Sequence, residues 1–271
     1  MVEHLTAAIE GKEMTPPAWL RRTGTDLAIC VAFCTRLPLA SSVPVEGRDV
    51  ARASWGLPVA GALIGAIAAL VYWLAHRIGL PPSPAAVLAL AAGVAITGAL
   101  HEDGLADTAD GFGGGKDREH KLAIMRDSRL GTYGACALAT SFMLRWSALA
   151  SLAGPLAVAI ALVAAHASAR AALPAFLHWV PPARSDGLSA DAGKPPAASA
   201  AAAAFLGACI LLVAFGAGGA LLCLLLLSLT SLGMAWLSLR QIGGQTGDAA
   251  GALEQAGECL VLLAATVLLG T

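Results

Sequence analysis

The feature that most constrains this chain is a series of long apolar blocks that contain almost no charged residues. Two of them, residues 198–215 and 219–239, are close to the roughly 20 residues that an α-helix needs to cross the hydrocarbon core of a bilayer. Hydrophobic residues make up 57% of the chain and charged residues 13%, against about 45–50% and about 25% in a soluble domain. The sequence therefore predicts an all-α, polytopic integral membrane protein.

The apolar blocks predict a helical bundle with about seven transmembrane helices. Residues 18–38 precede the first predicted span. They are expected to form an amphipathic or re-entrant helix that ends at Pro38, or an eighth crossing. Residues 1–17 lack an uninterrupted apolar core and are expected to be a flexible tail rather than a signal peptide. Residues 18–271 are then a single transmembrane catalytic domain. The seven predicted spans are 55–76, 85–105, 131–153, 156–180, 198–216, 219–239 and 253–270.

The connections between the spans fall into two groups. The short ones, 77–84, 153–155 and 217–218, contain a single basic residue, Arg77, whereas the longer connections are rich in Lys and Arg. Because Lys and Arg are enriched in cytoplasmic loops, the long connections are expected to face the cytoplasm from a cytoplasmic (inner) membrane. The formal net charge of -1 provides no basic stripe, so a nucleic-acid partner is not expected.

Three aspartates near the end of the second predicted span share one helix face. Asp103, Asp107 and Asp110 stand at i, i+4 and i+7, and no Lys or Arg occurs between Arg77 and Lys116. A carboxylate at membrane depth is costly without a partner. Since oxygen ligands favour Mg²⁺ or Mn²⁺, these three are predicted to hold a divalent cation. The alternative is a solvated acidic helix end, with Asp110 capping the turn that follows.

A basic segment follows the aspartates, with five Lys or Arg residues among positions 116–129. Its second half leads into the next span, where backbone N–H groups at a helix N-terminus favour anions. This half is predicted to bind a polyphosphate through Arg126, Asp127, Ser128 and Arg129. The alternative is a cytoplasmic amphipathic helix that follows the ordinary charge bias, and that interpretation is favoured for Lys116, Arg118 and Lys121.

A third polar cluster precedes the last span. Residues 243–248 read Gly-Gly-Gln-Thr-Gly-Asp, which suits a helix start, so capping alone would explain Asp248. Thr246 is a candidate anion contact. Capping does not explain Glu254 and Glu258, which stand one turn apart in an apolar helix. Their expected partners are two arginines within other spans, Arg145 and Arg170, although these arginines would also suit the aspartates.

Four motifs of this chain resemble those of the cobalamin synthase (adenosylcobinamide-GDP ribazoletransferase) family. They lie in the family's order at residues 34–38, 98–110, 124–132 and 243–248. Weaker agreement occurs at 55–65, at 168–170, and at Gly187-Leu188 with Lys194. One departure is Glu102, where the family usually has an apolar residue. The resemblance implies that adenosylcobinamide-GDP and α-ribazole, or its 5′-phosphate, are joined with Mg²⁺ as cofactor and release of GMP.

The site residues and the implied reaction fit together, because phosphoryl transfer depends on charge neutralisation and placement of the acceptor. Asp103 and Asp107, with Asp110, are predicted to hold Mg²⁺ on the pyrophosphate, while Arg126 and Arg129 contact phosphate oxygens. Arg36 and Lys194 are further candidates for phosphate contact. The expected acceptor of the ribose hydroxyl proton is Asp127, Asp248 or Glu254. A homo-oligomer, or association with other enzymes of cobalamin assembly, remains open.

Two other functions are compatible with carboxylates on membrane helices. A CDP-alcohol phosphotransferase also uses aspartates at helical spacing, but its motif has Arg where Asp107 stands here. A transporter would use intramembrane charges as an ion pathway and would be built from inverted repeats. No such repeat is evident in the sequence.

Overall fold

The computed structural model describes residues 18–37, 47–152, 154–185 and 193–270, and all the regular elements in these ranges are helices. The predicted all-α class is confirmed. The predicted tail, Pro38 and the Gly187-Leu188 pair lie outside the described residues. The helices are α2 (Ala18–Cys34), α3 (Gly47–Ala53), α4 (Leu57–Arg77), α5 (Pro82–Thr97), α6 (Leu100–Gly114), α7 (Arg118–Ile124), α8 (Thr132–Ser151), α9 (Pro155–Trp179), α11 (Ala197–Ile242) and α12 (Gly247–Leu269), with a short 3₁₀ turn, η1 (Ser54–Gly56), between α3 and α4.

Long apolar helices make this a multi-pass membrane protein, but the described residues contain fewer candidate spans than predicted. Four helical segments are long and apolar enough to cross a bilayer, or up to five if α5 and α6 together form one span, against the seven expected. The four are Gly47–Arg77, which combines α3, η1 and α4, and helices α9, α11 and α12. The difference arises in α5–α6, in α8 and in α11, which contains two of the predicted spans in one segment.

The predicted span 85–105 is not one straight helix, because it breaks between α5 and α6, which meet at 89°. Gly98 and Ala99 both have left-handed backbone angles, with φ of 66° and 61°, and a left-handed alanine is uncommon. Arg36 covers the break: its N–H donates to the Ile96 carbonyl at 2.7 Å and its guanidinium to the Gly98 carbonyl at 3.5 Å. The break turns α6 away from the direction of α5.

The rest of the difference arises in α8 and α11. Helix α8 occupies the predicted span 131–153, but it carries Arg145 and several hydroxyl side chains and is not among the candidate spans. The predicted spans 198–216 and 219–239 both lie in α11, in which two helices meet at a kink at Gly216 (φ 67°, ψ −178°). Lys194 before α11 and Gln245 after it line the same cavity, so the chain reverses direction at the kink, directly before the predicted connection 217–218.

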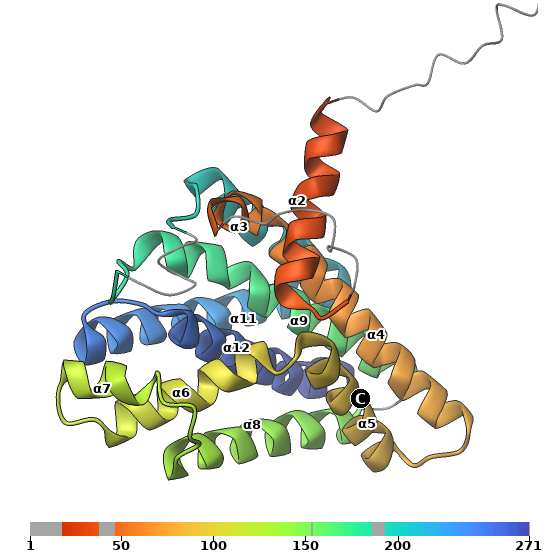
Figure 1. Ribbon diagram of the computed structural model, residues 1–271. Coiled ribbons are helices and arrows are strands. Elements are labelled where there is room, and N and C mark those ends of the chain that lie inside the picture. Colours follow the sequence, from red (N-terminus) through yellow and green to blue (C-terminus); the bar gives the residue numbers. More distant parts are fainter. Residues whose placement is uncertain (1–17, 38–46, 153, 186–192, 271) are drawn as a thin grey trace, which may run out of the picture.

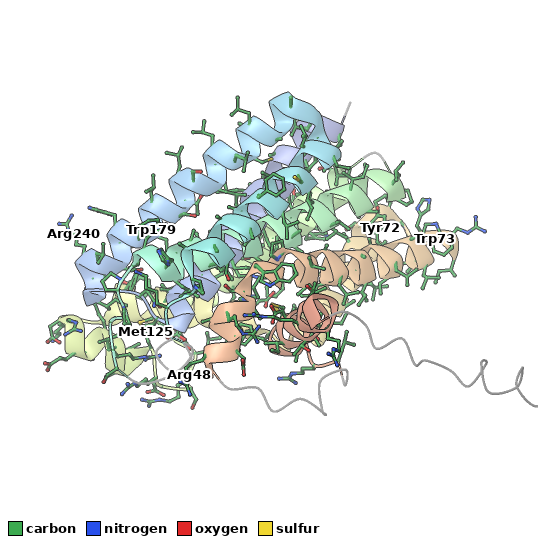
Figure 2. All side chains as sticks on the ribbon, turned by 90° about the horizontal axis from the view of Figure 1, so that it is seen from above. Arg48, Tyr72, Trp73, Met125, Trp179 and Arg240 are labelled. Carbon is green, nitrogen blue, oxygen red and sulfur yellow. The ribbon has the colours of Figure 1, made fainter. Side chains whose placement is uncertain are left out.

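The polar connections gather at one end of the helices, as the charge pattern predicted. Figure 2 shows Arg240, Trp179 and Met125 at one end of the molecule, and Tyr72 and Trp73 at the opposite end. Helices α6, α8 and α12 contact one another and run side by side (Figure 1), with α9 packed against α12 on its other side. The ends of α6, α9 and α11 therefore meet the start of α12 in one polar region.

Glycines bring α4 and α9 into close contact. A Cβ atom added at Gly61 would lie 2.2 Å from the His166 carbonyl oxygen, and one at Gly65 would lie 2.6 Å from the Leu162 carbonyl oxygen. Small residues at such spacing allow membrane helices to pack backbone to backbone. This contact fixes the position of α9, which carries part of the site described below.

We expect Gly61→Ala to lower the melting temperature of the detergent-solubilised protein, because the added methyl group overpacks the α4–α9 contact at a cost of roughly 1–3 kcal/mol. Gly233→Ala on α11 is the matched control. No atom lies within 4 Å of its added Cβ, so the substitution should be neutral or slightly stabilising. Equal melting temperatures for the two variants would contradict the described packing.

Candidate active site

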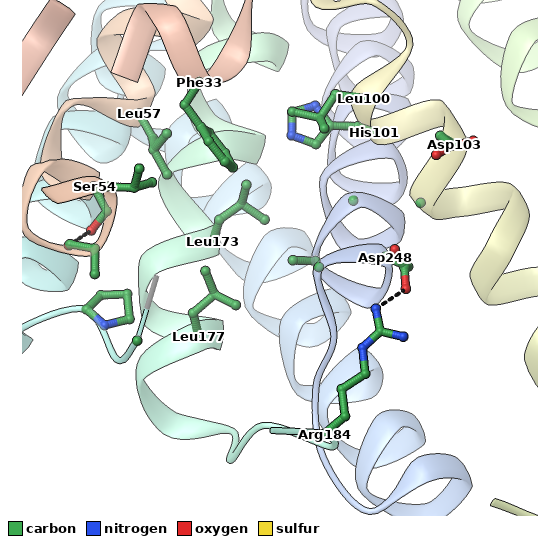
Figure 3. A pocket seen from close by; sticks show the side chains of 18 residues that line it. Phe33, Ser54, Leu57, Leu100, His101, Asp103, Leu173, Leu177, Arg184 and Asp248 are labelled. Carbon is green, nitrogen blue, oxygen red and sulfur yellow. Dashed lines mark hydrogen bonds and ion pairs between the residues drawn. The ribbon is translucent and has the colours of Figure 1, made fainter. Parts of the chain in front are cut away.

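A cavity of about 250 Å³ lies between the N-terminal helices and the α6–α12 pair (Figure 3). Its polar lining consists mainly of His101 and Asp103 from α6, Asp248 from the first turn of α12, and Arg184 from the connection after α9. Two of the polar segments singled out in the sequence, the one with Asp103 and the one with Asp248, thus contribute to one cavity.

Two glycines set the distance between α6 and α12. A Cβ added at Gly104 would lie 2.8 Å from the Asp248 carbonyl oxygen, and one at Gly251 would lie 3.3 Å from the Gly104 Cα. Any larger side chain at this crossing would push the two helices apart. The crossing therefore brings Asp103 on α6 and Asp248 on α12 to the same cavity.

Arg184 is positioned by backbone pairing between its connection and the segment before α12. The Gln245 N–H donates to the Pro181 carbonyl and the Ala183 N–H donates to the Gln245 carbonyl, both at 2.8 Å. The Arg184 guanidinium then lies 3.4 Å from a carboxylate oxygen of Asp248. The sequence showed Arg184 only as one of many basic loop residues, and its pairing with Asp248 was not predicted.

Arg118 holds the same region together from α7. Its guanidinium donates to the Ile242 carbonyl at 2.7 Å and to the Ala183 carbonyl at 2.6 Å. Lys121, one turn later, donates to the side chain of Gln241. These contacts agree with the interpretation that these two basic residues are structural rather than ligand contacts.

Asp103 and Asp107 keep unbalanced negative charge near the cavity. Among the residues that the structure describes, neither carboxylate has a hydrogen-bond or ion-pair partner. Asp107 is half-buried and lies in the electrostatic field of Asp103, Asp248 and Arg184. Three carboxylates therefore act on one region, and Arg184 is the basic group that acts on Asp107 and pairs with Asp248.

Asp110 has a different environment from the other two aspartates. Its two oxygens accept hydrogen bonds from the backbone N–H groups of Gly131 at 2.8 Å and Gly134 at 2.9 Å. It therefore caps the first turn of α8, where a carboxylate also interacts favourably with the helix dipole. The capping that was the alternative explanation for Asp110 is observed, although on α8, and its role as a metal ligand stays a prediction.

The predicted aspartate trio is not the tightest group of potential metal ligands. In the described part of the chain, the three residues whose ligand atoms all lie within 4.8 Å of one another are His166, Glu254 and Glu258. Their oxygens and nitrogen are already engaged by arginines, as described below. The Asp110 oxygens accept hydrogen bonds from the backbone at the start of α8, and the aspartate trio does not form a group of this kind.

Thr246, predicted to bind an anion, is the cap of α12. Its hydroxyl accepts a hydrogen bond from the Ala249 N–H at 3.2 Å, and its side chain is buried. Since Thr246 provides this cap, capping does not account for Asp248. The Asp248 side chain instead faces the cavity, where Figure 3 shows it paired with Arg184.

The predicted polyphosphate segment, residues 126–129, is not brought to the cavity. Asp127 and Arg129 pair with each other, with Arg129 Nε 3.0 Å from both carboxylate oxygens. This pair is at the surface, and Arg129 lowers the pKa of Asp127 to about 2. A carboxylate with so low a pKa is a weak general base at neutral pH. Arg126 and Ser128 are also exposed and do not line the cavity.

Arg36 and Lys194, the other predicted phosphate contacts, lie outside the cavity lining. Arg36 is exposed and covers the α5–α6 break. Lys194 is exposed at a neighbouring cavity of about 290 Å³, which it lines together with Gln245 and Trp179. Gly193, the neighbour of Lys194 in the sequence, lines both cavities.

Beneath the cavity, a buried cluster of ion pairs joins α9 to α12. Arg170 lies 2.5 Å from Glu254 and 2.9 Å from Glu258, and all three side chains are at most 2% exposed. His166 contacts Glu258, and His101 lies 3.5 Å from Glu254. Glu254, predicted as a proton acceptor, is thus enclosed in this cluster and does not line the cavity, although it lies beside His101, which does.

Arg145 extends the buried cluster to α6 and α8. Its guanidinium lies 3.2 Å from Glu102 and 3.2 Å from Glu258. The expectation that Arg145 and Arg170 are partners of Glu254 and Glu258 is confirmed. The contribution of His166 was missed in the sequence, although its position four residues before Arg170 places both side chains on one face of α9.

Comparison with known proteins assigns the family. Residues 26–266 match the sequence profile of cobalamin-5-phosphate synthase. The chain belongs to this family. A relative from Bradyrhizobium diazoefficiens is 59% identical over 91% of this chain and 95% of its own length, and one from Mesorhizobium japonicum is 55% identical over 91% and 94%.

Both relatives are named adenosylcobinamide-GDP ribazoletransferase, so the family resemblance stated from the four motifs is confirmed. No solved structure matches the chain. The geometry of the cavity and of the buried cluster therefore comes from this chain alone and not from a related solved structure.

We expect Arg170→Met to destabilise the protein by about 3–5 kcal/mol, because it leaves two buried carboxylates without their guanidinium. Chemical unfolding in detergent, followed by circular dichroism, measures the loss. Arg129→Met is the matched control, since the Asp127–Arg129 pair is exposed and such pairs contribute about 0–1 kcal/mol. A loss for Arg170→Met no larger than that of the control would show that the cluster does not stabilise the fold.

Proposed function

We propose that this chain is an adenosylcobinamide-GDP ribazoletransferase. It joins adenosylcobinamide-GDP to α-ribazole, or to the 5′-phosphate of α-ribazole, and forms adenosylcobalamin, or its 5′-phosphate, with release of GMP. The names of its relatives and the family match over residues 26–266 support this reaction. Neither a CDP-alcohol phosphotransferase nor a transporter has comparable support.

The observation that carries the proposal is the polar end of the cavity, where carboxylates from α6 and α12 face one region beside a single guanidinium. Transfer of a substituted phosphate group needs neutralisation of the pyrophosphate and a placed acceptor hydroxyl more than a covalent nucleophile. The side chains of Asp103, Asp248 and Arg184 line the cavity. Their acidic and basic groups can serve both to neutralise the pyrophosphate and to place the acceptor hydroxyl.

The acidic residues fit a divalent cation of the Mg²⁺ type. Asp103 and Asp107 supply oxygen ligands and have no ion-pair partner among the described residues, and Mg²⁺ in proteins is held by one or two carboxylates together with substrate phosphates. We propose that these two residues hold Mg²⁺. When bound, the ion neutralises negative charge on the pyrophosphate. The added contribution of Asp110 is less favoured, because its oxygens already cap α8.

The remaining residues of the cavity have separate roles in the proposed transfer. The acceptor ribose oxygen forms a bond to the phosphorus that bears the cobinamide group, and the bond from that phosphorus to the oxygen of GMP breaks. Asp248 is the best-placed acceptor for the hydroxyl proton, since Glu254 is enclosed and Asp127 is paired at the surface. Arg184 lies beside Asp248 and can contact phosphate oxygens.

We further propose that the protein resides in the cytoplasmic (inner) membrane with the cavity end facing the cytoplasm. The basic connections and the cavity residues Asp248 and Arg184 belong to the same end of the bundle, and the enrichment of basic residues in cytoplasmic loops supports this orientation. Self-association, or association with other enzymes of cobalamin assembly, stays a prediction.

We expect purified wild-type protein in liposomes to release GMP from adenosylcobinamide-GDP and α-ribazole 5′-phosphate when Mg²⁺ is present, and to stop when EDTA is added. Asp103→Asn and Asp107→Asn should lower the rate at least about 100-fold, because removing a group that stabilises charge in the transition state has effects of this size. GMP and the complete cobamide are both measured by chromatography.

Glu119→Gln is the control for these variants, since Glu119 is an exposed carboxylate on α7 without a described ion pair. It should retain the wild-type rate. Absence of GMP from well-folded wild-type protein would refute the reaction. Full activity in Asp103→Asn and Asp107→Asn would leave the reaction standing but refute the proposed metal ligands.

A further inference from the structure

The cavity has two chemically different sides. Figure 3 shows Phe33, Leu57, Leu173 and Leu177 on one side, and the Asp248–Arg184 pair on the other. The apolar side is built by α2, α4 and α9, which pack against α12 in one hydrophobic cluster. We call these four side chains the apolar wall. A wall of this kind next to the carboxylates is not needed to bind a pyrophosphate.

The apolar wall has little capacity for hydrogen bonding. The polar side chain next to it is Ser54, whose hydroxyl donates to the Ala51 carbonyl at 2.8 Å. Guanine presents several donors and acceptors on its edges, and burying such groups without partners is costly. A guanine base is therefore a poor occupant of this side.

The size of the cavity also restricts the occupant. Its volume of about 250 Å³ is below the roughly 300–1,000 Å³ of pockets that enclose a drug-sized ligand. A corrinoid ring system is far larger than such a ligand and has to remain outside. The cavity is suited to a single flat ring system attached to a ribose.

On these grounds we propose that the apolar wall binds the base of the ribazole acceptor and determines which bases are accepted. This inference rests on the proposed function. Ribazole carries a methylated benzimidazole, a flat and largely apolar bicyclic ring whose hydrogen-bonding needs are small. With this base against Leu173 and Leu177, the attached ribose extends toward Asp248, the residue proposed to accept its proton.

The four wall residues differ in their suitability for a test. Leu57 and Leu173 are 3% and 4% exposed and belong to the hydrophobic core, so their truncation would also damage the fold. Phe33 is 37% exposed, and Leu177 is half-buried at the edge of the core. Phe33 and Leu177 therefore report on the ligand rather than on folding.

The experiment measures kcat/KM for two acceptors, α-ribazole 5′-phosphate and the analogue that lacks both methyl groups, with Phe33→Ala and Leu177→Ala. Wild-type protein should prefer the methylated base at least about 10-fold, since one methylene in an apolar pocket is worth about 10–200-fold. Both variants should reduce this preference several-fold and raise KM for α-ribazole 5′-phosphate. KM for adenosylcobinamide-GDP should not change.

Matched controls separate base binding from general damage. Phe205→Ala on α11 and Leu144→Ala on α8 remove exposed side chains that do not line the cavity, and they should keep the wild-type preference. Leu177→Met retains volume and should restore most of the preference, because Leu-to-Met exchange is well tolerated.

The inference is overturned if Phe33→Ala and Leu177→Ala keep the wild-type ratio between the two acceptors. It is also overturned if they change KM for adenosylcobinamide-GDP instead, since the wall would then contact the donor. Failure of wild-type protein to form GMP with either acceptor would refute the proposed function itself, and this result is distinct from a change in the ratio.

Discussion

Arg170 lies at the centre of the buried ion pairs on which the rest of the structure depends. Its guanidinium contacts Glu254 and Glu258 on α12 from its position on α9, and Arg145 links Glu258 to Glu102 on α6. Charged side chains inside a membrane protein are costly unless they are paired, so a helix arrangement that separated these groups would be strongly disfavoured. The ion pairs therefore select one relative placement of α6, α8, α9 and α12.

That placement determines the geometry of the cavity. Glu102 is adjacent in sequence to Asp103, and Glu254 follows Asp248 on the same helix, so the residues that fix α6 and α12 lie next to those that face the ligand. The Gly104–Gly251 contact allows the two helices to meet closely. We infer that the buried cluster holds the helices while Asp103 and Asp107, which lack ion-pair partners among the described residues, remain available to a cation and to substrate. Neighbouring residues of the same helices thus stabilise the fold and provide the proposed catalytic groups.

Much of this was accessible from the sequence, because carboxylates and arginines inside apolar blocks have few ways to be satisfied. The helical class was predicted from the apolar blocks, and the gathering of polar segments at one end from the distribution of Lys and Arg. The pairing of Arg145 and Arg170 with Glu254 and Glu258 was predicted from the cost of unpaired charges in a membrane. The position of residues 126–129 was not predicted correctly. Local composition does not determine whether a basic loop folds over a site or forms ion pairs within itself, as Arg129 does with Asp127. The α5–α6 break was missed because it depends on a left-handed Ala99 stabilised by the distant Arg36. The apolar wall is equally invisible in the sequence, because Phe33 and Leu177 read as ordinary membrane residues.

The most direct test of the account is Mn²⁺ binding to the purified protein in the presence of adenosylcobinamide-GDP, followed by electron paramagnetic resonance and competed with Mg²⁺. The account predicts one competable site whose affinity falls at least about 10-fold in Asp103→Asn and Asp107→Asn, an effect in the range seen when partners of a metal site are removed. His166→Gln should leave that affinity unchanged. Binding that persists in both aspartate variants and disappears in His166→Gln would place the metal in the buried cluster and contradict the account.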